Sequence, residues 1–142
     1  MEPALSMMTK TCERKILAVD DGSDAIKLIK KSSQIIGVSV DGFTDPILAL
    51  DHFLTHSNEY FLVISDLAMP SLNGFEFIRK IRSTSPDIKI ILMTTSDITN
   101  SYLFRELASS LKIDCTVQKP ISFREIKCTI QKQKLLHVTI DC

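Results

Sequence analysis

Five short apolar segments recur along the chain, and the stretches between them repeat their apolar residues every three or four positions. The segments are "KILAV" (15–19), "GVSVDGF" (37–43), "YFLVIS" (60–65), "IKIILMT" (88–94) and "IDCTV" (113–117). Strands that alternate with helices pair in parallel, because each strand needs a crossover before the next can run in the same direction. The first, third and fourth segments are almost wholly apolar, which is typical of a sheet covered on both faces. The pattern predicts a doubly wound α/β fold with five parallel strands and five helices.

Residues that start and stop helices separate these segments. Ser23 and Gly37 flank a predicted helix over 24–36 as its N-cap and its stop. The other four helices are predicted to begin at Pro46, after Asn73-Gly74, at about residue 98 (running to 111) and at the capping box "SFRE" (122–125). For the second and fourth helices, the spacing predicts that the core-facing residues are Ile47, Leu50, Leu54, Leu103, Leu107 and Leu111.

The length of 142 residues suits one domain. We predict a domain over 14–134, an N-terminal tail over 1–13 and a C-terminal tail over 135–142. In that last segment "LLHVTIDC" alternates apolar and polar residues, which leaves open a short added strand or a disordered end.

Composition excludes several functional classes. Lys and Arg together number 17, as do Asp and Glu, so no net charge attracts a nucleic acid or an anionic membrane. No apolar run approaches the roughly 20 residues that span a bilayer. We therefore expect a cytoplasmic protein that binds neither. The four cysteines have no zinc-ligand spacing, and the three histidines lack ligand partners, so we expect reduced thiols and solvated histidines.

Polar side chains follow four of the five predicted strands at their carboxyl ends. They are Asp20, Asp21, Asp66, Thr94, Thr95 and Lys119. Because the carboxyl ends of parallel strands share one edge of a sheet, and ligands bind beyond that edge, these residues are expected to meet there.

Three carboxylates at one place repel one another unless a cation neutralises them. Mg²⁺ prefers oxygen ligands and takes one or two carboxylates together with water and phosphate oxygens. A lysine and a threonine hydroxyl supply a charge and a hydrogen-bond donor for a phosphoryl group. We therefore interpret Asp66 as a nucleophile that carries a phosphoryl group beside a metal-holding acid pair.

"VDD" after the first strand, "SDLAMPSLNG" around Asp66, a threonine ending the fourth strand and "KP" after the fifth resemble the receiver domain of two-component response regulators. The resemblance covers about residues 14–133. Within this family, the chain is similar to the stand-alone chemotaxis regulators. The resemblance implies a flavodoxin-like sheet of strand order 2-1-3-4-5. It also implies a signalling module and not an enzyme.

The resemblance assigns roles by position. Asp66 would be the phosphoacceptor, and Asp20, Asp21, Asp66 and the backbone carbonyl of Ala68 would hold Mg²⁺. Thr95 would be the switch hydroxyl, with Thr94 as the alternative if the register is one residue off. Lys119 would contact the phosphoryl oxygens, and its bond to Pro120 would be cis.

The expected partners follow from the same resemblance. A histidine kinase or phosphotransfer protein would supply the phosphoryl group, and a protein partner or second copy would dock on the face built from 98–111, 113–117 and the helix from 122. That face would include Tyr102, Arg105 and Gln118. The family often places an aromatic residue where this chain has Thr116, so its aromatic lever is missing here.

Two other readings use the same residues. One is a receiver-like interaction module that works without phosphorylation. The other is an aspartate-nucleophile phosphohydrolase of the haloacid-dehalogenase type, which typically needs an acid two residues after the nucleophile, where this chain has Ala68.

Overall fold

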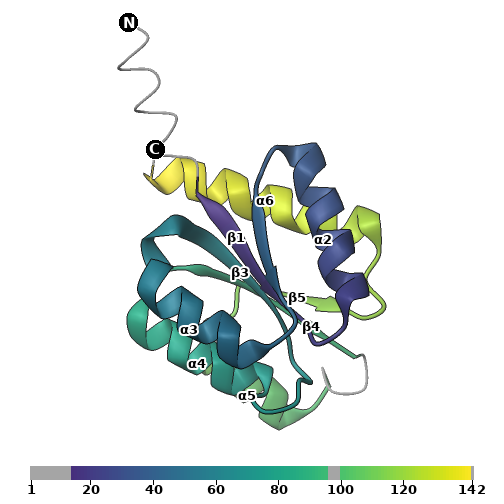
Figure 1. Ribbon diagram of the computed structural model, residues 1–142. Helices are drawn as coiled ribbons and strands as arrows, with labels where there is room; N and C mark the ends of the chain where they lie inside the picture. Colours follow the sequence, from purple (N-terminus) through teal and green to yellow (C-terminus); the bar gives the residue numbers. More distant parts are fainter. Residues whose placement is uncertain (1–13, 96–99, 142) are drawn as a thin grey trace, which may run out of the picture.

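The sheet has the predicted strand order. The computed structural model describes residues 14–95 and 100–141, with side chains as far as Leu136. Its strands are β1 (Lys15–Val19), β2 (Val40–Phe43), β3 (Tyr60–Asp66), β4 (Lys89–Thr94) and β5 (Cys115–Gln118). Every neighbouring pair is parallel, in the order β2-β1-β3-β4-β5 (Figure 1). The predicted α/β fold class is therefore confirmed.

Helices cover both faces of this sheet. They are α2 (Ser23–Ile36), α3 (Pro46–His56), α4 (Gly74–Thr84), α5 (Tyr102–Ser110) and α6 (Phe123–Asp141), with a short 3-10 turn η1 (Ser57–Glu59) before β3. In Figure 1, α2 and α6 lie on one face, and α3, α4 and α5 on the other. Among the helices of the described residues, none is long and apolar enough to cross a bilayer.

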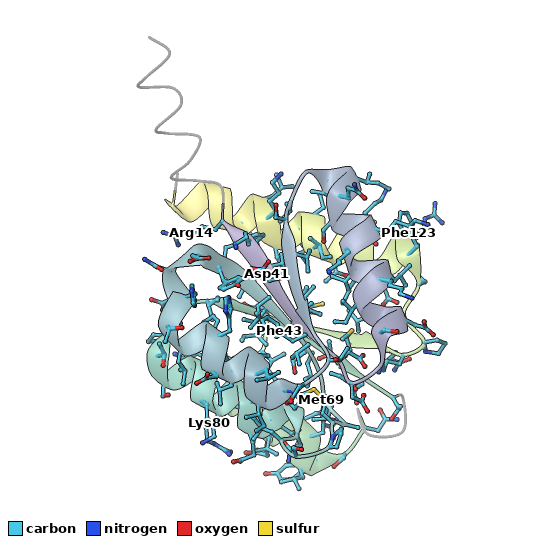
Figure 2. All side chains as sticks on the ribbon, in the orientation of Figure 1. Arg14, Asp41, Phe43, Met69, Lys80 and Phe123 are labelled. Carbon is cyan, nitrogen blue, oxygen red and sulfur yellow. The ribbon has the colours of Figure 1, made fainter. Side chains whose placement is uncertain are left out.

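The strand residues divide between two cores. Along β1, Leu17 and Val19 pack with α3 and α4, while Ile16 and Ala18 pack with α2 and α6. β4 alternates in the same way, as does β3 from Leu62 onward, because successive side chains of a strand point to opposite faces. Figure 2 shows side chains filling both spaces between sheet and helices. Double coverage explains the continuous apolar runs in the sequence.

Most of the predicted helix ends are confirmed. Pro46 begins α3, and the side chain of Asn73 caps α4 by accepting a bond from the Glu76 amide at 3.0 Å. Ser122 caps α6 through the Glu125 amide. Ser23 as N-cap was wrong: Gly22 holds that position and Ser23 is the first helical residue.

The second strand is shorter than predicted. Gly37 ends α2 in the left-handed region at φ 88°, where its amide donates to the Ser33 and Gln34 carbonyls. The chain can pair with β1 only after this turn, so β2 begins at Val40 instead of residue 37.

Two helices face the core with a different phase from the predicted one. In α3, Ala49 and Phe53 are buried, while Ile47 and Leu54 are exposed. Helix α5 begins at Tyr102, after the cap residue Ser101, and not at residue 98. Its inward residue is Phe104, whereas Leu103, expected in the core, is 65% exposed.

The C-terminal segment continues a helix. No glycine or proline interrupts α6, which runs to Asp141 through most of the predicted tail. The interpretation of 135–142 as an added strand was therefore wrong for the described residues.

Candidate phosphoacceptor and metal site

Three carboxylates meet where β1 and β3 end. The register pairs Val19 with Ser65, so the next residues of the two strands, Asp20 and Asp66, lie side by side. Asp20, Asp21 and Asp66 each place a carboxylate oxygen within 4.8 Å of those of the other two. Asp20 and Asp66 are buried, and Asp21 is exposed at the rim.

Lys119 joins this acid cluster from the end of β5. Its Nζ lies 2.9 Å from Asp20 Oδ2 and 3.2 Å from Asp66 Oδ1. Its backbone amide donates to the Thr94 carbonyl at 2.8 Å, and the Lys119–Pro120 bond is cis, as the resemblance implied. The lysine therefore bridges the two buried acids.

The charges of the cluster do not balance. Burial, followed by the repulsion from Asp20, raises the pKa of the Asp66 carboxyl above its usual range, although Lys119 opposes the change. Burial alone would lower the Lys119 pKa, but the ion pairs with Asp20 and Asp66 raise it. One lysine cannot neutralise three carboxylates, so a further cation would reduce the repulsion among them.

The donor set fits Mg²⁺. It consists of carboxylate oxygens at an edge open to water, without cysteine or histidine, and Mg²⁺ prefers such oxygen ligands. No other set of three or more candidate metal-binding side chains comes together within the described residues.

The loop after β3 packs closely on the backbone of Asp66. Gly74 donates its amide to the Leu67 carbonyl at 2.8 Å, and a Cβ at Gly74 would stand 2.5 Å from the Asp66 carbonyl oxygen. Only glycine fits this approach without a shift of backbone. In the sequence, Asn73-Gly74 indicated only the start of a helix. The structure adds that Gly74 sets the position of the Asp66 peptide.

A buried hydroxyl also holds that peptide. Ser65 is fully buried in β3, and its Oγ donates to the Asp66 carbonyl at 2.9 Å. Sequence analysis did not single out Ser65. A hydroxyl within an otherwise apolar strand was the signal that would have found it.

The two threonines of β4 differ in place. Thr94 is the last residue of the strand, pairs with Gln118 and is 2% exposed, whereas Thr95 lies beyond the strand and is exposed. Among the described residues, the hydroxyl of Thr94 donates a long 3.4 Å bond to the Thr95 carbonyl. It is therefore available for another acceptor.

The histidines lie away from the acid cluster. His52 was expected to be solvated, but it is half-buried, with Nε2 2.9 Å from the Tyr60 hydroxyl and its ring stacked on His56. His137 lies outside the described side chains.

A family model described as the response regulator receiver domain matches residues 16–131. This is most of the chain, and it includes every residue of the acid cluster and Lys119. The chain belongs to the response regulator receiver domain family. It is a receiver domain of two-component signalling.

Curated relatives agree with this membership. The chain is 34% identical over 120 residues to a probable transcriptional regulator, ycf27, of Cyanidium caldarium, covering 84% of this chain and 45% of the relative. It is 31% identical over 112 residues to response regulator MprA of a Mycobacterium species, covering 79% and 46%. A sensor protein, EvgS of Escherichia coli, is 29% identical over 124 residues, covering 87% and 10%. The chain spans about half the length of the first two relatives.

Solved structures share the fold. Chemotaxis protein CheY4 of Vibrio cholerae superimposes with a TM-score of 0.73 at 26% identity, covering 84% of this chain and 97% of that one. A receiver domain protein of Clostridium thermocellum gives 0.76 at 25% identity, covering 89% and 98%.

Proposed function

We propose that this receiver domain accepts a phosphoryl group on Asp66 in a Mg²⁺-dependent reaction and passes the change to a protein partner. The observation that carries the proposal is the buried pair of Asp66 and Asp20 bridged by Lys119, with Asp21 alongside. A histidine kinase or phosphotransfer protein is the proposed donor.

The reaction is a substitution at phosphorus. An Asp66 carboxylate oxygen attacks the phosphorus of the donor's phosphohistidine, an O–P bond forms and the N–P bond breaks. The electron pair of that bond stays on the imidazole nitrogen, which leaves without a further reactant. Asp66 must be ionised to attack, and Lys119 at 3.2 Å favours that form.

The acid cluster and the backbone carbonyl of Ala68 are the proposed metal ligands. When bound, Mg²⁺ supplies positive charge to the oxygens of the transferred group. Lys119, which contacts Asp66 Oδ1 at 3.2 Å, would contact the phosphoryl oxygens. Asp20 is already oriented, because its Oδ1 accepts a 2.8 Å bond from the Gly22 amide.

For the switch hydroxyl we propose Thr94 in place of Thr95. Thr94 ends β4 next to the strand that carries Asp66, is buried, and is bonded through its carbonyl to the Lys119 amide. Thr95 is exposed beyond the strand. If Thr94 is the switch, Thr94→Ala will reduce the conformational response to phosphorylation and Thr95→Ala will leave it close to wild type.

Two surfaces serve the proposed partners. A groove of about 270 Å³ opens beside Lys119, between the start of α2 and the turn before α6, and includes Ala25, Leu28 and Ile121. We propose that the donor docks over this groove. The output face is formed by α5, β5 and α6, where Tyr102, Arg105 and Gln118 are exposed.

The test is incubation with acetyl phosphate and Mg²⁺, followed by intact-protein mass spectrometry. We expect one added phosphoryl group, lost with chelator and lost in Asp66→Asn, because an amide cannot act as the nucleophile. Asp87→Asn, a matched change at an exposed position, will keep it. Incorporation that persists in Asp66→Asn would contradict the assignment, and no incorporation in wild type would favour the phosphorylation-independent module. Steady release of inorganic phosphate at a high rate would favour the phosphohydrolase.

A further inference from the structure

The aromatic residue Phe75 directly follows Gly74, whose backbone packs on that of Asp66. Gly74 contacts the Asp66 carbonyl so closely that a methyl group would not fit, and Phe75 is the next residue. Any shift of the Asp66 backbone therefore displaces the first turn of α4, which carries the half-buried Phe75 ring.

The Phe75 ring contacts α5. Its centroid lies 5.6 Å from that of Phe104, with the planes at 62°, the favourable edge-to-face arrangement. Phe104 is the one residue of α5 that is buried, whereas Tyr102 and Leu103 beside it are exposed. The amino-terminal half of α5 is therefore held on the core through Phe104, which contacts Phe75.

The other end of α5 is anchored separately. The Arg82 guanidinium donates to the carbonyls of Leu111 at 2.8 Å and Lys112 at 2.7 Å, just beyond α5. It also donates to the carbonyls of Pro86 and Ile88 in the loop before β4. An arginine with several donors in a fixed plane is a rigid link. Helix α5 thus has a firmly held carboxyl end and a lightly held amino end.

The position of the family's usual aromatic lever offers no alternative. Thr116 lies on β5, paired with Leu92, and is half-buried with a short side chain. A threonine cannot reach as far as an aromatic ring or exclude one by its bulk.

We propose that the Phe75–Phe104 contact couples the phosphoacceptor loop to α5, so that a change at Asp66 moves the amino end of α5 about the Arg82 anchor. Phe75 is thus a positioning residue for the output face. The inference rests on the proposed function, because it takes phosphorylation of Asp66 as its trigger. It differs from a response through the Thr94 hydroxyl, which would pass through β4.

The experiment is amide NMR of the full chain with and without Mg²⁺ and beryllofluoride, a phosphoryl mimic. In wild type we expect shifts at the site, in residues such as Leu67 and Lys119, and along α5. In Phe75→Leu the site shifts will remain, and the α5 shifts will fall at least about twofold. Phe104→Leu will have the same effect, and the double variant will add little, because both changes remove one contact.

A matched control is Phe43→Leu. Phe43 is also a half-buried aromatic at a strand end, but its ring contacts His52 on α3. This variant will keep the α5 shifts. Because Phe104 is buried and its replacement can loosen the fold, Phe75→Leu is the deciding variant, and its thermal unfolding is measured alongside.

The outcomes separate the two proposals. Site shifts in wild type with full α5 shifts in Phe75→Leu, or equal losses in Phe43→Leu, overturn the aromatic route and leave the proposed function intact. Absence of any site shift and of any phosphoryl mass removes the proposed function and this inference with it.

Discussion

Two clusters of charge, each centred on a lysine, occupy opposite ends of the central strands. At the amino ends, Lys15 of β1 lies 2.9 Å from Asp41 of β2 and 3.2 Å from Glu59. At the carboxyl ends, Lys119 bridges Asp20 and Asp66. Lysine and carboxylate side chains thus meet at both ends of the sheet, but in different electrostatic surroundings.

The amino-end cluster is satisfied. The Tyr60 hydroxyl donates to Asp41 at 2.6 Å and lies 2.9 Å from His52. Burial alone would raise the Asp41 pKa, but the bonds from Tyr60 and Lys15 hold it below its usual range. The bonds of Lys15 to Asp41 and Glu59 raise the pKa of Lys15, although burial opposes the change. Each charge has partners that favour its ionised form, as expected for a structural network.

The carboxyl-end cluster is left short of positive charge. The buried Asp66 carboxyl has a raised pKa, because of its burial and then the repulsion from Asp20. The comparison teaches that a buried acid in unfavourable electrostatic surroundings, and not the presence of charge, distinguishes the candidate site. The volume of a hollow would not identify this site. A larger hollow of about 640 Å³, lined in part by Asn58, Pro86 and Asp87, lies away from the acid cluster.

The largest expected effect comes from removing a proposed metal ligand. Asp20→Asn keeps the shape of the side chain and removes one charge, so Mg²⁺ affinity will fall at least about tenfold. Calorimetric titration with Mg²⁺ measures this. Asp41→Asn makes the same change in the satisfied cluster and will leave the affinity unchanged. Equal losses in the two variants would contradict the distinction.

The next largest expected effect is an increase in Mg²⁺ affinity. Lys119→Met keeps an apolar stem and removes the cation that now contacts Asp20 and Asp66. The three carboxylates then lack any neutralising group, so Mg²⁺ affinity will rise several-fold in the same titration. We also expect slow phosphorylation to survive while the shifts on α5 and β5 are lost. A weaker affinity for Mg²⁺, or a normal conformational response, would reject this role.

A smaller effect tests the amino-end cluster. Tyr60→Phe removes the hydroxyl that binds Asp41 and contacts His52, which will lower the free energy of unfolding by about 1–2 kcal/mol. Urea denaturation measures it. Phosphorylation and Mg²⁺ affinity will not change. Tyr102→Phe, at an exposed tyrosine, is the control and will be nearly neutral.

The smallest effect is the dependence of stability on pH without metal. The raised pKa of Asp66 means that the folded state holds this proton more tightly, so wild-type stability falls as pH rises from 3.8 through the raised value. Asp66→Asn lacks this fall and gains stability relative to wild type across that window. Asp41 has a lowered pKa, so its contribution is present above 3.8 and is lost as pH falls through the lowered value.

The measurement is urea denaturation of both asparagine variants and wild type at a series of pH values in chelator. Asp41→Asn will show its full deficit above 3.8 and a shrinking one below. Parallel curves for the two variants would show that the clusters do not differ in the way proposed.

The residues at the site were predictable because their position depends only on where a strand ends. Asp20, Asp66 and Lys119 each follow an apolar run, and parallel strands bring such ends to one edge whatever the details of packing. Errors arose where one residue of register matters. Leu103 and Phe104 differ by one position, and local periodicity does not resolve which of two adjacent residues faces inward.

The sequence by itself determined the fold class, the strand order through its resemblance, and the edge at which the chemistry lies, because these follow from patterns within short stretches. Only the tertiary structure decided which distant residues meet away from that edge. Phe75 and Phe104 are far apart in the chain, as are Arg82 and Lys112, and Asp41 and Tyr60. Their contacts depend on how the helices and strands pack together, and no local pattern of apolar and polar residues encodes that packing.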